Sequence, residues 1–175
     1  MQPINLLKAT LEEKADKTRF LFSAQDFSSV FPDFTKENMR MLLSRAAKSG
    51  ILQRVCKGLY LYPKSGFDSS TVLFKVASRL RANYLNYISL ESALSQEGII
   101  SQQLLAWLTV MTTGRSGTID CGRFGTVELI HTAKSQEKII PHLRLDTVSG
   151  MWRADKELAM MDMKNAKRNL IIRNF

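Results

Sequence analysis

The sequence has little of the residue types that build metal centres and disulfide frameworks. Its 175 residues include two cysteines and two histidines. Cys56 and Cys121 lie far apart without CxxC spacing, and neither His131 nor His142 belongs to an HExxH pattern. Structural zinc and a disulfide framework are therefore not expected, and no cofactor is expected.

Long hydrophobic runs are also missing. The longest apolar stretch runs from Leu104 to Met111, far short of the ~20 residues that a membrane-spanning helix needs. The first residues include acidic side chains, without the basic region and continuous apolar segment of a secretory signal. We therefore expect a cytoplasmic protein without a membrane partner.

Acidic residues are too few to balance the basic ones. Lys and Arg number 25 against 16 Asp and Glu, which gives a net charge of +9 and a pI near 9.8. The excess is concentrated in Lys36 to Lys64, where seven basic residues face a single acid, Glu37. Such a surface favours polyanionic partners, first of all nucleic acid or an anionic membrane surface, through counterion release and electrostatic steering.

The N-terminal third predicts three helices and a hairpin. A first helix is expected to end near Lys17, and a short second one to begin after Ser23. Thr35 is a suitable N-cap for a third helix that Gly50 would end. Its apolar stripe consists of Met39, Leu42, Leu43, Ala46 and Ala47. Two β-prone runs around Lys57 and Gly58 follow, so residues 1–65 are predicted to form a winged helix-turn-helix.

The polar face of the third helix and the hairpin supply the candidate DNA-binding residues. Helix side chains would contact base edges and nearby phosphates, while those of the hairpin would contact the sugar-phosphate backbone. The predicted set is Thr35, Lys36, Asn38, Arg40, Ser44, Arg45, Lys48, Arg54 and Lys57. Tyr60 and Tyr62 could stack on bases, but their alternation with leucines favours packing in a small core.

Residues 66–175 predict a second domain, a small α+β domain. A helix is expected from Ser69 or Ser70, then a short strand and a Ser89-capped helix ending before Gly98. Strand-like segments at 107–113 and 126–131 indicate an antiparallel sheet. An amphipathic helix is expected from Asp155 to about Arg173.

Catalytic patterns are weak, so we expect no enzyme. The segment from Gly114 to Gly117 lacks the ending of a phosphate-binding loop, which favours a plain hairpin turn. Asp120 and Glu128 lie in consecutive strand-like segments. A metal-dependent nuclease site would need a lysine two residues after Glu128, and that position holds Ile130. Whether either histidine has a catalytic neighbour depends on the fold.

Two segments carry a resemblance to a known family. The first includes Lys57, Gly58, Leu59 and Tyr60; the second includes Tyr87, Ile88, Ser89, Leu90, Ser92, Ala93, Leu94 and Gly98. A weaker third segment matches at Ala154, Glu157, Ala159 and Asp162. Together they resemble the AbiEi family of antitoxins and transcriptional regulators, over about residues 35–165.

The resemblance implies an N-terminal DNA-binding domain that represses its own operon at an inverted-repeat operator. It also implies a C-terminal domain that counters a nucleotidyltransferase-type toxin, functionally if not by direct binding. This chain stops soon after the third segment, whereas many family members continue into further helices. The alternative is an interaction protein whose C-terminal domain neutralises a toxin while its basic surface is incidental. The oligomeric state is open, with a homodimer as one option.

Overall fold

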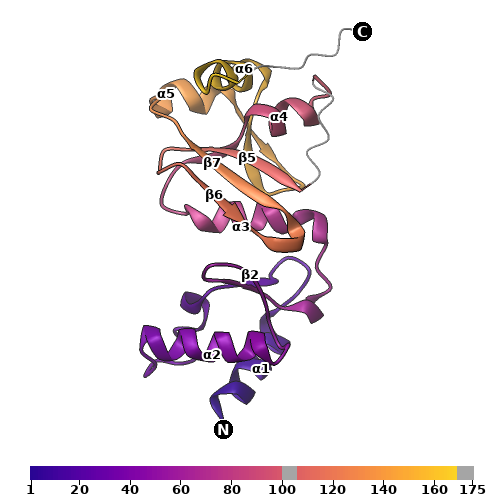
Figure 1. Ribbon diagram of the computed structural model, residues 1–175, viewed down its shortest axis with the longest axis vertical. Coiled ribbons are helices and arrows are strands. Elements are labelled where there is room, and N and C mark those ends of the chain that lie inside the picture. Colours follow the sequence, from indigo (N-terminus) through magenta and orange to yellow (C-terminus); the bar gives the residue numbers. More distant parts are fainter. Residues whose placement is uncertain (100–105, 169–175) are drawn as a thin grey trace. The chain divides into compact units, whose positions relative to one another are not determined.

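The computed structural model describes residues 1–99 and 106–168, which form a mixed α+β structure (Figure 1). The chain forms two compact units, Met1–Ser70 and Thr71–Phe175. The division follows Ser70, whereas the sequence placed it after Ser65. No described helix is both long and apolar enough to cross a membrane. We call the two parts unit 1 and unit 2 and describe each separately.

Unit 1 begins with helix α1, Pro3–Lys14, which ends one turn before the predicted Lys17. Ala15 is extended, and the Asp16 carboxylate accepts hydrogen bonds from the backbone N–H groups of Thr18 and Arg19, at 2.6 and 2.8 Å. These bonds stabilise a local turn in place of another helical turn.

The predicted second helix of unit 1 is a single 3₁₀ turn, η1, Ala24–Phe27. Ser23 begins it, since its backbone N–H donates to the Asp26 carboxylate at 2.6 Å. Pro32 follows closely and disfavours helical backbone at Phe31. The segment therefore turns, and Phe27 and Phe31 are both buried.

Helix α2, Lys36–Lys48, confirms the predicted third helix. The Thr35 hydroxyl caps it by accepting from the backbone N–H of Asn38 at 3.1 Å. Gly50 follows with φ +77°, which glycine adopts without a Cβ penalty. The predicted apolar stripe is buried except for Ala47, which is half-buried.

Three short strands complete unit 1 as an antiparallel sheet of order β1-β3-β2. Their bounds are Leu21–Phe22 for β1, Gln53–Cys56 for β2 and Leu59–Leu61 for β3. Gly58, at φ +80°, joins β2 to β3. Tyr60 and Tyr62 lie in the core with the buried residues of α1 and α2, which confirms their predicted packing role.

Unit 2 contains a six-stranded sheet of order β6-β7-β5-β4-β9-β8. The strands are β4 Asn86–Ile88, β5 Trp107–Thr112, β6 Gly117–Asp120, β7 Thr126–His131, β8 Leu143–Asp146 and β9 Met151–Ala154. The expectation of an antiparallel sheet is wrong for this unit. The sheet is mixed, because β5 runs parallel to β7 and β4 runs parallel to β9.

The position of strand β6, which contains Asp120, explains the parallel pair. The strand pairs antiparallel with β7 on the side away from β5, so the chain reverses twice between β5 and β7. The segment Gly114–Gly117 is therefore a crossover and not the predicted hairpin turn. Gly125 lies before β7 at φ +107°, and a Cβ there would be 2.0 Å from the carbonyl oxygen of Ala106.

Helices cover both faces of this sheet. Helix α3, Val72–Leu80, lies on one face, while α4, Leu90–Gln96, and α6, Lys156–Asn165, lie on the other (Figure 1). The short α5, Gln136–Ile139, precedes β8. Helix α6 ends well before the predicted Arg173, and residues beyond 168 lie outside the described part of the chain.

The Asp162 side chain on α6 is fully buried beneath these helices. Its carboxylate accepts hydrogen bonds from Ser89 at 2.7 Å, Tyr87 at 3.1 Å and the Lys134 ammonium at 2.6 Å. Burial, together with the neighbouring carboxylate, raises the pKa of Tyr87, so its phenol stays protonated as a donor. Ser89 precedes α4 as predicted, but its hydroxyl serves Asp162 and not the helix end.

Changing Lys134 to Met should destabilise unit 2. Breaking a buried ion pair costs about 3–5 kcal/mol, and we expect about 2–3 kcal/mol here because the lysine keeps some solvent contact. Both tryptophans, Trp107 and Trp152, belong to unit 2, so urea unfolding followed by tryptophan fluorescence reports on this unit. Lys138→Met, at an exposed position of α5, is the matched control. Equal losses in the two variants would contradict the role of the buried pair.

Candidate nucleic-acid interface

All nine predicted DNA-binding residues are exposed, and all lie in unit 1. Because the opposite face of α2 packs into the core, its polar residues are held outward. Lys36, Arg40, Ser44 and Lys48 follow one another at intervals of four residues and form one stripe. Asn38 and Arg45 lie further round the same exposed side.

The N-terminal half of α2 borders a groove of about 460 Å³. Thr35, Lys36 and Arg40 line one side of it, and the rest is largely apolar, including Phe31 and Phe34. The Arg40 guanidinium lies 3.3 Å from the Glu37 carboxylate, but both side chains are more than 70% exposed. Such a pair contributes little, so Arg40 is free to exchange this partner for another anion.

The C-terminal half of α2 borders a second groove, of about 530 Å³, shared with the β2–β3 hairpin. This groove brings together Ser44 and Lys48 of α2 with Arg54 of β2, which follows the helix after a short turn. The Nε–H of Arg54 donates to the carbonyl of Cys56 at 3.4 Å, a long bond that leaves the outer guanidinium nitrogens available. Lys57 is exposed at the hairpin tip and lines neither groove.

Met41 was missed by the sequence prediction. It is 57% exposed on the polar side of α2, next to Arg40. A methionine in an amphipathic helix is usually assigned to the apolar stripe, and only its angular position separates it from Met39. An exposed apolar side chain among polar ones can contact the methyl group of thymine.

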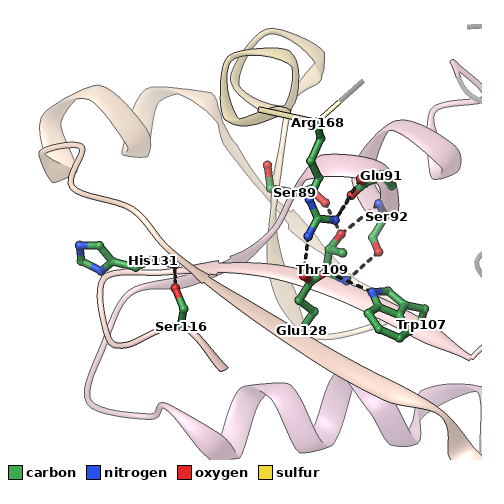
Figure 2. A network of polar contacts seen from close by, with 9 residues as sticks. All are labelled: Ser89, Glu91, Ser92, Trp107, Thr109, Ser116, Glu128, His131 and Arg168. Atoms are coloured by element: carbon green, nitrogen blue, oxygen red, sulfur yellow. Dashed lines mark hydrogen bonds and ion pairs between the residues drawn. The ribbon is translucent and has the colours of Figure 1, made fainter. Parts of the chain in front are cut away.

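The two carboxylates that suggested nuclease chemistry both make structural contacts in unit 2. Asp120 accepts from the backbone N–H of Gly122 at 2.8 Å, and Glu128 belongs to a polar network (Figure 2). The Arg168 guanidinium binds Glu128 and also both carboxylate oxygens of Glu91, at 3.0 Å each. Trp107 donates its indole N–H to Glu128 at 3.2 Å. Burial alone would lower the pKa of Arg168, but its hydrogen bonds with Glu128 and Glu91 outweigh burial and raise it. Within residues 1–99 and 106–168, no three His, Cys, Asp or Glu side chains cluster as metal ligands would.

The fold gives each histidine a neighbour of the kind that catalysis would need, Ser116 for His131 and Asp155 for His142. The Nδ1 of His131 lies 2.8 Å from the Gly114 carbonyl, and the Ser116 hydroxyl accepts from the backbone N–H of His131 (Figure 2). His142 contacts Asp155 at 2.8 Å, and that carboxylate also caps α6. Desolvation raises the pKa of Asp155, but hydrogen bonds from Leu158 and His142 outweigh it and lower the pKa. Both histidines therefore hold backbone or helix ends in place.

No protein-family model and no curated protein matches the chain.

The residues that carried the family resemblance occupy two places in the structure. Lys57 and Gly58 form the hairpin tip of unit 1, with Tyr60 buried behind it. Tyr87 and Ser89 from the second segment meet Asp162 from the third in the buried cluster of unit 2. Lys57 and Gly58 are therefore exposed, whereas Tyr87, Ser89 and Asp162 are buried in the interior of unit 2.

Removal of the α2 cap should loosen this helix. Thr35→Ala deletes the acceptor for the N–H of Asn38 and should cost about 1 kcal/mol of helix stability. Hydrogen exchange of the α2 amides should show the loss, while Thr35→Ser keeps the hydroxyl and should retain most of the protection. Unchanged exchange in Thr35→Ala would contradict the capping role.

Proposed function

We propose that the protein is a sequence-specific regulator that binds double-stranded DNA through unit 1. The observation that carries the proposal is that one small unit presents an exposed basic helix beside an exposed basic hairpin. An ordinary solvated helix face would explain the first feature but not the second. Lys48 and Arg54 bordering one groove join the two features into a single cationic surface.

The order of elements in unit 1 supports a winged helix-turn-helix. Helix α1 is followed by β1, the 3₁₀ turn η1, helix α2 and the β2–β3 hairpin. In this arrangement α2 is the recognition helix and the hairpin is the wing. The 3₁₀ turn η1 takes the place of the second helix in the order of elements, and its Ala24 and Gln25 line the first groove together with residues of α2.

Charge and side-chain type divide the surface into two roles. Arg40 and Asn38 carry planar groups that can bind base edges in a bidentate manner, and they lie in the first half of α2. Lys57 presents a single point charge at the wing tip, which suits a phosphate. We therefore assign sequence readout to α2 and backbone contact to the wing.

The family resemblance extends this proposal. An AbiEi-like regulator would act in the cytoplasm on an inverted repeat upstream of its own operon. It would also counter a nucleotidyltransferase-type toxin through unit 2, functionally if not by direct contact. DNA from upstream of the gene is therefore the first substrate to test.

Arg40→Ala should weaken binding to the specific upstream site by about 1–3 kcal/mol, with little effect on random DNA, because it removes a base contact. Arg40→Lys should lose most of the same discrimination, since lysine keeps the charge but not the planar fork. Electrophoretic mobility shift on both DNAs measures the difference, with Lys8→Ala on α1 as the charge-matched control. Equal weakening on both DNAs would assign Arg40 to the backbone.

Lys57→Ala should weaken all sequences alike and reduce the slope of log K against log salt by about one unit, because one phosphate contact is lost. Fluorescence anisotropy over a series of salt concentrations gives the slope. Lys8→Ala removes an equal charge away from the proposed interface and should leave the slope unchanged. An unaltered slope in Lys57→Ala would mean that the hairpin does not contact DNA.

A further inference from the structure

The β8–β9 hairpin of unit 2 exposes an apolar pair at the margin of the sheet. Leu145 of β8 and Trp152 of β9 are direct cross-strand partners. They are 56% and 46% exposed. Val148, in the connecting turn, is 81% exposed. Single exposed apolar residues are common, but an adjacent pair that includes a residue of the edge strand marks a surface suited to contact.

The backbone of β8 is open on the side away from β9. Within the part of the chain that the structure describes, β8 pairs with β9 alone and forms one edge of the sheet. Leu143 lies opposite Ala154, so the next pair in the same register is His142 and Asp155. That pair is hydrogen-bonded, because the Asp155 N–H donates to the His142 carbonyl at 2.8 Å. Hydrogen-bonded pairs alternate along antiparallel strands, so the N–H and C=O groups of Leu143 and Leu145 point outward from the sheet.

The sequence of this edge is complementary to itself. If two copies of β8 pair antiparallel about a two-fold axis at Leu145, the outward groups of each Leu145 meet those of the other. Arg144 of each copy then lies directly opposite Asp146 of the second copy, at a close, non-hydrogen-bonded position. Opposite charges in such a cross-strand pair are stabilising, and like charges are destabilising.

We propose that β8 is a homodimerisation surface, on which a second copy of this chain adds its own β8 antiparallel with the two-fold axis at Leu145. The axis brings together both Leu145 side chains, each next to a Trp152, on one face of the joined sheet. The two pairs of Arg144 and Asp146 lie on the other face. This proposal is independent of DNA binding.

The contacts that Arg144 and Asp146 make in the single chain are compatible with the proposed pairing of two copies of β8. In the single chain, Arg144 donates to the carbonyls of Leu143 and Pro141 at 2.9 and 3.2 Å, which covers the open edge. Arg144 is exposed, so these bonds can be replaced at small cost. Asp146 accepts from the N–H of Val148 and the hydroxyl of Ser149, and each carboxylate oxygen can accept a further bond.

Disulfide trapping tests the axis on the full chain. With the axis at residue 145, the two Cα atoms of Leu145 would be about 5.5 Å apart, inside the range of disulfides. Leu145→Cys should therefore form a covalent dimer under mild oxidation. Val148→Cys is the matched control, because it is more exposed yet would lie about 20 Å from its copy. The native thiols, Cys56 and Cys121, are buried.

A dimer trapped in Leu145→Cys and not in Val148→Cys supports the proposal. Equal trapping in both variants would indicate random collision and overturn it, as would no trapping in either. Adding Arg144→Asp to Leu145→Cys should abolish trapping, because two acidic residues would then face two acidic residues. Trapping that survives this change would overturn the register.

Charge exchange tests the same register without a covalent bond. Arg144→Asp and Asp146→Lys should each be monomeric in sedimentation, while an equimolar mixture of the two should form a heterodimer. The unmodified protein should dimerise in a concentration-dependent manner, because an interface of this small size is weak. A monomer at every concentration, or dimers of either variant alone, would contradict the proposal.

Discussion

Unit 2 depends on the buried carboxylate of Asp162. A charge removed from water costs several kcal/mol unless it is paired and hydrogen-bonded. Its partners come from two segments distant in sequence from α6: Tyr87 and Ser89 lie in and directly after β4, and Lys134 follows β7. Helix α6 can therefore dock only when the middle of the sheet is already in place. The diversion of the Ser89 hydroxyl from its own helix end shows that this requirement takes precedence over local capping.

Arg168 makes a second connection of the same kind. Glu91 on α4 and Glu128 on β7 are largely buried, with 14% and 18% of their side chains exposed. Two such carboxylates would repel each other. The Arg168 guanidinium lies between them and forms charge-assisted hydrogen bonds with each (Figure 2). The chain that follows α6 is thereby fixed to the helix layer and to the sheet together. Polar contacts thus set the arrangement of a unit whose apolar residues alone would permit several.

Most of unit 1 could be predicted from the sequence because its signals are local. The cap at Thr35, the stripe beginning at Met39 and the glycine at position 50 lie within one helix length, and the structure has each of them. The candidate interface residues were exposed for the same reason, since an amphipathic helix allows only one side to face out. Met41 was missed because its apolar side chain is of the type expected in the core, although its place two residues after Met39 puts it on another side of the helix. The second helix became a 3₁₀ turn because Pro32 and two buried phenylalanines limit its length.

The sheet of unit 2 could not be predicted because its pairings are distant in sequence. Alternation in 107–113 and 126–131 indicates two strands but carries no information on which strand lies between or beside them. The segment of Asp120 was expected to be a strand, but nothing local in its sequence places it on the side of β7 away from β5. Tyr87, Ser89 and Asp162 were noticed as separate motifs, and only the fold shows that they share one cluster.

The central position of β4 has a consequence for the synthesis of the chain. Unit 1 has all three of its strands once Leu61 has left the ribosome, whereas β4 pairs on one side with β9, which is made much later. Domains form as units during translation, N-terminal first. The nascent chain therefore passes through a stage in which unit 1 can fold while one side of β4 is unpaired. The rate of translation between Ile88 and Met151 sets how long the unpaired edge of β4 is accessible to chaperones and to other nascent chains.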